Sequence, residues 1–130
     1  MIITRSVDIE DVIRTALSPY QTAYCAPLPT EYALPCILVT VAGGSSERNQ
    51  AGRSKVDTFT VILDARAELE SDAMEYLRNA IGILENIEIE GLSHITTNSL
   101  YSWGTDPVRP DLAMCSATLL ATSHRETTTI

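Results

Sequence analysis

The sequence predicts an α+β fold, in which two helices pack on one mostly antiparallel sheet made of two β-hairpins. Two segments carry apolar residues at helical spacing, and two pairs of segments have the composition of strands. Their order along the chain is helix, hairpin, helix, hairpin. The 130 residues suit a single domain over residues 1–130, and 45% of them are apolar, enough for a core without disulfides or metals.

The first helix is expected over residues 8–18. Acidic residues in its first turn suit the positive end of the helix dipole, and Pro19 ends it. Residues 19–35 contain four prolines and predict an irregular connection, in which residues 22–26 could form a short strand. The buried stripe of the helix is expected to consist of Ile9, Val12, Ile13, Ala16 and Leu17.

The first hairpin is expected to join a β-branched, apolar strand over residues 36–42 to an alternating strand over residues 55–65. Its polar loop, residues 43–55, has the composition of a phosphate-binding loop. Such a loop must run from a strand into a helix, whereas this one runs from strand to strand and lacks the Gly-Lys-Ser/Thr order. Nucleotide binding is therefore not expected.

A second helix is expected over residues 71–86, with apolar residues along one stripe. Residues 94–103 and 112–123 predict a second hairpin, in which the later strand alternates between two faces. The tail, residues 124–130, is expected to be frayed.

The net charge of −8, with Lys55 as the only lysine, does not suit a protein that grips nucleic-acid phosphates. It suits a surface that repels DNA or that meets a partner in a large assembly. The first residues lack the apolar core of a signal peptide, and no run of ~20 apolar residues is present to span a bilayer. We expect a soluble chain, made in the cytoplasm and without membrane contact.

Residue spacing gives little support for chemistry. The three cysteines are expected to be plain thiols, and no Cys or His spacing suits a metal, so neither a metal nor a cofactor is expected. Two groups keep a small enzyme or ligand-binding domain as an alternative: Cys115 with His94, and the acidic cluster Glu85, Glu88 and Glu90. Cys115 lies in an apolar strand, where a thiolate is disfavoured, and the carboxylates suit solvated surface. No catalytic residue is expected.

Five residues are candidates for a protein contact. Tyr101 and Trp103 precede a turn, where they either pack over the sheet end or anchor an interface. The other three are the basic residues of the polar loop, which could meet an acidic surface on a neighbouring protomer or on a partner: Arg48, Arg53 and Lys55.

The order of elements and four local stretches resemble the tail-terminator (tail-completion, or minor tail) proteins of long-tailed bacteriophages. The resemblance covers residues 9–122 and consists of order, length and weak motifs. The stretches are "ALPCILVTV", "VDTFTVILDAR", "ESDAMEYLRNAIGILENI" and "LYSWGTDPVRPDLAMCSATLLAT". The entry to the first long strand is its best local feature, carried by Leu34, Pro35 and Ile37.

The resemblance implies a non-enzymatic virion protein. Such proteins form a hexameric ring on the head-proximal end of the tail tube, stop its polymerisation and dock the neck, and DNA later passes through the ring. The implied partners are further copies of the chain, the tail tube protein and a neck or head-completion protein. The implied place is the tail or neck of a virion assembled in the host bacterial cytoplasm. A head-completion or neck connector protein is a second virion role that the sequence leaves open.

Overall fold

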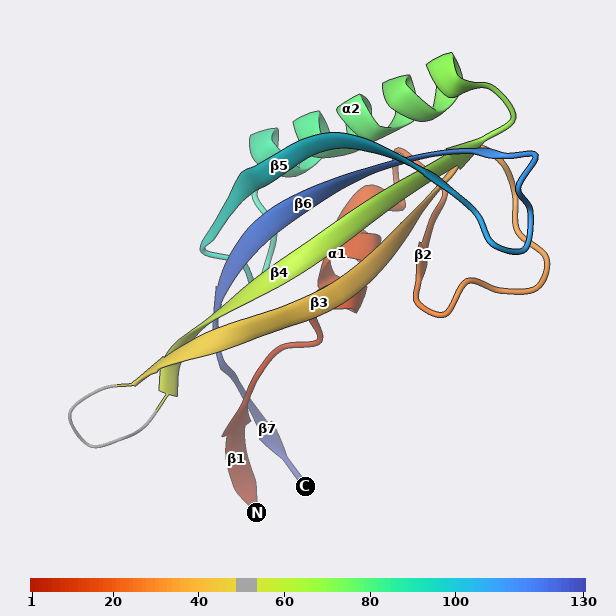
Figure 1. Ribbon diagram of the computed structural model, residues 1–130. Coiled ribbons are helices and arrows are strands. Elements are labelled where there is room, and N and C mark those ends of the chain that lie inside the picture. Colours follow the sequence, from red (N-terminus) through yellow and green to blue (C-terminus); the bar gives the residue numbers. More distant parts are fainter. Residues whose placement is uncertain (49–53) are drawn as a thin grey trace.

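The computed structural model describes residues 1–48 and 54–130 and has the α+β class that the sequence predicts (Figure 1). Two helices pack on a mostly antiparallel five-stranded sheet, and a separate two-stranded sheet lies beside it. The elements are β1 (Ile2–Arg5), α1 (Ile9–Leu17), β2 (Ala23–Cys25), β3 (Cys36–Arg48), β4 (Ser54–Ala67), α2 (Glu70–Asn86), β5 (His94–Thr105), β6 (Ala113–His124) and β7 (Glu126–Thr129).

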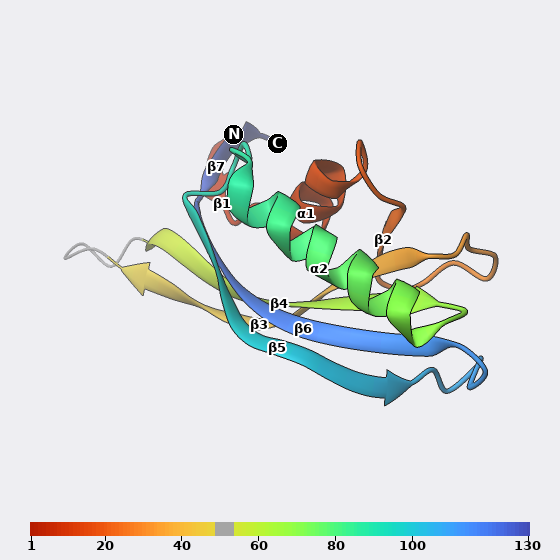
Figure 2. The ribbon, with the colours of Figure 1, turned by 90° about the horizontal axis from the view of Figure 1, so that it is seen from above.

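The five-stranded sheet has the order β2-β3-β4-β6-β5. The short strand β2 runs parallel to β3, and every other neighbouring pair is antiparallel. Both helices cover the same face of the sheet, and the other face is open (Figure 2). The strands β5 and β2 therefore form the two edges of the sheet.

The core lies between the helices and the covered face of the sheet. The helix α1 buries Ile9, Ile13 and Leu17 of the predicted stripe, whereas Val12 and Ala16 are half-buried. The helix α1 packs on the β2 and β3 side of the sheet, and α2 packs on β4 and β6. Alternate residues of β4 and β6 point toward α2, because successive side chains of a strand point to opposite faces. The covered face of these two strands contributes Val61, Leu63, Ala65, Ala67, Cys115, Ala117, Leu119 and Ala121.

The first hairpin is longer than the sequence predicts. The expected loop at residues 43–55 is largely strand, since β3 continues to Arg48 and β4 begins at Ser54. The register shifts between Val41 and Gly43, which marks a β-bulge at the point where the hairpin extends past the core. Residues 42–46 are all exposed, so their sequence lacks the alternation of apolar and polar residues that identifies a half-buried strand. The sequence of this stretch therefore looks like that of a loop.

The expected frayed tail at residues 124–130 is replaced by strand. Residues Glu126–Thr129 form β7, which pairs antiparallel with β1 from Ile2↔Thr129 to Arg5↔Glu126. The two ends of the chain thus provide hydrogen-bond partners for each other. Among the described residues, neither helix is long and apolar enough to cross a bilayer.

Candidate functional site

The outer strand β5 holds the most exposed apolar surface of the five-stranded sheet. Within the described part of the chain β5 pairs with β6 on one side only. Near its C-terminal end, Leu100, Tyr101 and Trp103 have exposed fractions of 56%, 37% and 48%. Figure 1 shows that this end of β5 diverges from α2, so the helix does not cover it. Large apolar side chains on an uncovered strand form a candidate protein contact.

Two irregularities in β5 help to expose these side chains. The register against β6 shifts between Thr97 and Ser99 and again between Ser99 and Ser102. Beyond them Trp103 lies opposite Cys115, whose side chain belongs to the covered face. Bulges bend a strand and change where its side chains point. The indole therefore lies on the helix side of the sheet, at its uncovered rim.

A buried ion pair fixes the chain where β5 ends. Arg66 Nε donates to Asp106 Oδ2 at 2.9 Å, and both side chains are nearly inaccessible. The other oxygen of Asp106 accepts the backbone N–H groups of Val108 and Arg109 at 2.8 and 3.1 Å. Burial alone would raise the pKa of Asp106, but the bonds from Arg66 and the two amides outweigh it and lower that pKa. The exposed end of β5 is thus held by a rigid turn.

The second uncovered edge belongs to β3. The strand β2 pairs with β3 only at Ile37–Val39, so within the described residues the stretch 40–46 has its outer edge open. A buried carboxyl group fixes this stretch from the covered face. Asp57 accepts hydrogen bonds from Ser46 at 2.6 Å and from Ser6 at 2.7 Å, and Arg125 Nε lies 3.2 Å from it.

The sequence-predicted contact residues do not form one site. Tyr101 and Trp103 lie on β5, near the end of the sheet where Cys115 faces Ala65. Arg48 ends β3 and Lys55 is the second residue of β4, so both lie at the opposite end of the sheet. Arg53 lies outside the described residues.

The remaining basic residues are mostly paired within the chain. Each of five arginines lies within ion-pair distance of a carboxylate: Arg5 with Glu126, Arg14 with Asp11, Arg66 with Asp106, Arg109 with Asp111 and Arg125 with Asp57. Two of these pairs, Arg66–Asp106 and Arg125–Asp57, involve a buried carboxylate, whereas the other three are exposed at the surface. That Arg48, Arg53 and Lys55 meet an external acidic surface stays a prediction from the sequence.

The Cys115 and His94 pair is not assembled. Cys115 is fully buried on the covered face, whereas His94 is exposed at the other end of β5, opposite Thr122. Burial raises the pKa of the Cys115 thiol, which makes the thiolate less available. These two side chains cannot act on a common substrate in this structure.

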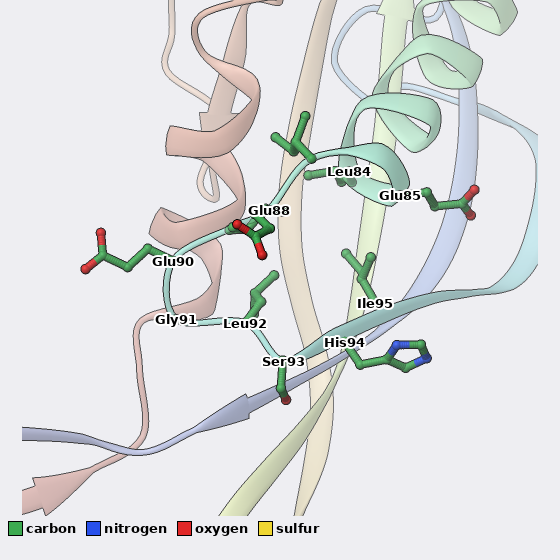
Figure 3. A pocket seen from close by; sticks show the side chains of 11 residues that line it. Leu84, Glu85, Glu88, Glu90, Gly91, Leu92, Ser93, His94 and Ile95 are labelled. Carbon is green, nitrogen blue, oxygen red and sulfur yellow. The ribbon is translucent and has the colours of Figure 1, made fainter.

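The acidic cluster lines a hollow of about 770 Å³ between the end of α2 and the start of β5 (Figure 3). The carboxylates of Glu85, Glu88 and Glu90 point in three different directions. Glu85 accepts a hydrogen bond of 2.6 Å from the Thr97 hydroxyl group, which ties α2 to β5. Within the described residues, no group of three or more His, Cys, Asp or Glu side chains could hold a metal ion.

Sequence reasoning missed two features of the candidate interface. The first is the exposure of Leu100. The face on which Leu100 lies cannot be read from simple alternation, because β5 has two register shifts around this residue. The second is the pair of open edges, because a sequence does not state the order of strands in a sheet. One signal was available: β5 contains no Asp, Glu, Lys or Arg, and neither do residues 36–46.

Comparison of the chain with protein-family models gives no match, and comparison with curated proteins gives no significant match.

Proposed function

We propose that this chain is a structural subunit of a bacteriophage tail, which forms a ring at the head-proximal end of the tail tube. In this role it stops tube polymerisation and joins the tail to the neck, and DNA passes through the ring. The proposal follows from the resemblance in element order and from one observation. The uncovered end of β5 presents Leu100, Tyr101 and Trp103 on a strand edge, held by the buried Arg66–Asp106 pair.

This arrangement suits a permanent protein contact better than a small-molecule site. An aromatic pair beside another large apolar side chain is typical of the anchors of protein interfaces. The two hollows beside the acidic cluster are open to solvent. Leu100, Tyr101 and Trp103 line neither of them. A ring of this kind needs one surface for its neighbours and others for the tube and neck.

The test is capping of the tail tube. Purified chain is added to polymerising tube protein of the same particle, and tube lengths are measured by electron microscopy. We expect shorter tubes and a ring at one end of each tube. Tubes of unchanged length with bare ends would contradict the proposal. Binding to the portal or head-completion ring alone would instead support a neck connector.

The first prediction concerns Trp103. Trp103→Ala should weaken self-association about tenfold or more, because truncating an anchor costs at least about 1–2 kcal/mol. Val108→Ala is the matched control, since Val108 is 85% exposed but lies in the turn beyond β5. Native mass spectrometry over a concentration series measures both. Equal association by the two variants would show that β5 is not the contact.

A further inference from the structure

We infer that copies of this chain associate head to tail by strand pairing, with β5 of one copy against the open stretch of β3, residues 40–46, of the next. The inference rests on the proposed ring and identifies the surface that builds it. Its partner is a second copy of the chain, and its chemistry is a main-chain hydrogen-bond ladder supported by apolar and small side chains.

Both edges have backbone groups available for pairing. The two lie on opposite sides of the same sheet, β5 at one side and β3 beyond the end of β2 at the other. Figure 1 shows α1 behind the sheet and α2 beside the middle of β5, whereas the C-terminal end of β5 turns away from α2. An edge strand with open N–H and C=O groups is a template for a strand of another chain.

Neither edge has the protection that monomeric proteins usually place there. Natural edge strands are blunted by charged residues, above all lysine, because a charge opposes pairing. The chain is 20% charged, yet β5 and residues 36–46 contain no Asp, Glu, Lys or Arg. Neither of the two stretches that would have to meet therefore contributes a charged side chain of its own.

The strand directions suit a head-to-tail contact. The strands β3, β4, β6 and β5 alternate in direction, so β3 and β5 run in opposite directions. A copy rotated about an axis roughly parallel to the strands keeps its own β3 direction. Its β3 would then lie antiparallel to β5 of the first copy, and the antiparallel order would continue across the contact. Repetition of one rotation produces a ring when the rotation closes.

The side chains of the two edges complement each other in size. One edge has Leu100, Tyr101 and Trp103, whereas the other has Ala42, followed by two glycines and two serines up to Ser46. Aromatic residues beside glycine in a neighbouring strand are a known stabilising arrangement, because the ring covers the exposed backbone. Pairing of β5 with β5 would place large side chains together and leave the β3 edge open.

Disulfide trapping tests the inference. The background is Cys25→Ser, because Cys25 is the one partly accessible thiol. Single cysteines are placed on the open face of each edge: Thr96→Cys, Ser99→Cys or Ser102→Cys on β5, and Thr40→Cys or Ser45→Cys on β3. A β5 variant and an isotope-labelled β3 variant are mixed, oxidised mildly and analysed by mass spectrometry. Val108→Cys is the matched control for an exposed thiol off the edges.

We expect mixed dimers of one β5 variant with one β3 variant, at least tenfold above the yield with Val108→Cys. Homodimers of a β5 variant alone would show two-fold pairing and overturn the inference. If rings form and cap the tube but no mixed disulfide appears at any of the six position pairs, the inference fails while the proposed function stands. If the chain neither assembles nor caps the tube, the proposed function fails.

Discussion

At the residue scale, Asp57 joins the two sheets. It is 2% exposed, and its hydrogen bonds reach the link before α1, the strand β3 and the approach to β7 through Ser6, Ser46 and Arg125. Burial raises the pKa of Asp57, but the bonds from Ser46, Ser6 and Arg125 outweigh it, so that the pKa lies below its ordinary value. Asp57→Asn should lower the free energy of unfolding at pH 7 by about 3 kcal/mol, because it leaves Arg125 without its carboxylate.

The pH dependence of this variant has a definite sign. A carboxyl group whose folded pKa is depressed stabilises the fold above its unfolded pKa of about 3.9 and loses that contribution as pH falls through the folded pKa. Unfolding by urea at pH 7 and at several values below about 4 should show a steeper loss for the native chain than for Asp57→Asn. Parallel losses would contradict the assigned role. Asp106 and Asp111 also have lowered pKa values, so the variant keeps part of the slope.

The buried pair Arg66–Asp106 gives a second prediction at this scale. Asp106→Ala should cost about 3–5 kcal/mol, because it leaves the Arg66 charge buried and removes the acceptor for two turn amides. The double variant Arg66→Met with Asp106→Ala should be more stable than Asp106→Ala alone. Chemical denaturation of both variants measures the difference. A double variant no more stable than Asp106→Ala alone would show that the buried Arg66 charge is not the cause of the loss.

At the scale of elements, the long hairpin depends on Gly44. A Cβ atom at this position would lie 2.6 Å from the backbone oxygen of Thr58 on β4, closer than real contacts allow. Gly44→Ala should therefore push β3 and β4 apart beyond the bulge and accelerate amide exchange at residues 56–60. Gly82→Ala is a matched control, since a Cβ there meets nothing within 4 Å and the change favours helix. Unchanged exchange in Gly44→Ala would contradict this close approach.

The sequence predicted both helices and the strands of the two hairpins, and it missed β1, β7 and the outer part of the first hairpin. The helix stripe of Ile9, Ile13 and Leu17 and the alternation of β6 both reflect contact with the core, so periodicity identified them. Residues 43–48 form strand outside the core and looked like loop. The tail has the run "ETTT", whose β-branched residues suit a strand, but the strand exists only because β1 pairs with it from the other end of the chain.

The candidate site was predictable in part for the same reason. The composition of β5 marked Tyr101 and Trp103 as unusual, whereas their exposure depends on the strand order and on two bulges that no local pattern indicates. The ion pair of Arg66 with Asp106 joins residues 40 apart in sequence, and nothing in the spacing favours that pairing over others. Long-range pairings of this kind follow from the topology.

At the scale of the whole molecule, salt distinguishes two ways of assembling the ring. Each copy has a net charge of −8, so copies repel one another at low ionic strength. A contact through the uncharged edges of β5 and β3 gains nothing from opposite charges, and salt only screens the repulsion. A contact through Arg48, Arg53 and Lys55 on an acidic neighbour depends on attraction, which salt weakens. The Debye length falls from ~10 Å at 0.1 M salt to ~3 Å at 1 M.

We therefore expect self-association to stay constant or strengthen between 0.05 and 0.5 M NaCl, in sedimentation or light-scattering titrations. Charge reversal of Arg48, Arg53 and Lys55 together should then leave ring formation intact while it weakens binding to the tube, if these residues face a partner. Dissociation of the ring on adding salt, together with loss of the ring in the charge-reversed variant, would assign the subunit contact to the hairpin. In that case the uncharged edges would need another occupant. The trapping experiment would then give no mixed disulfide between β5 of one copy and β3 of another.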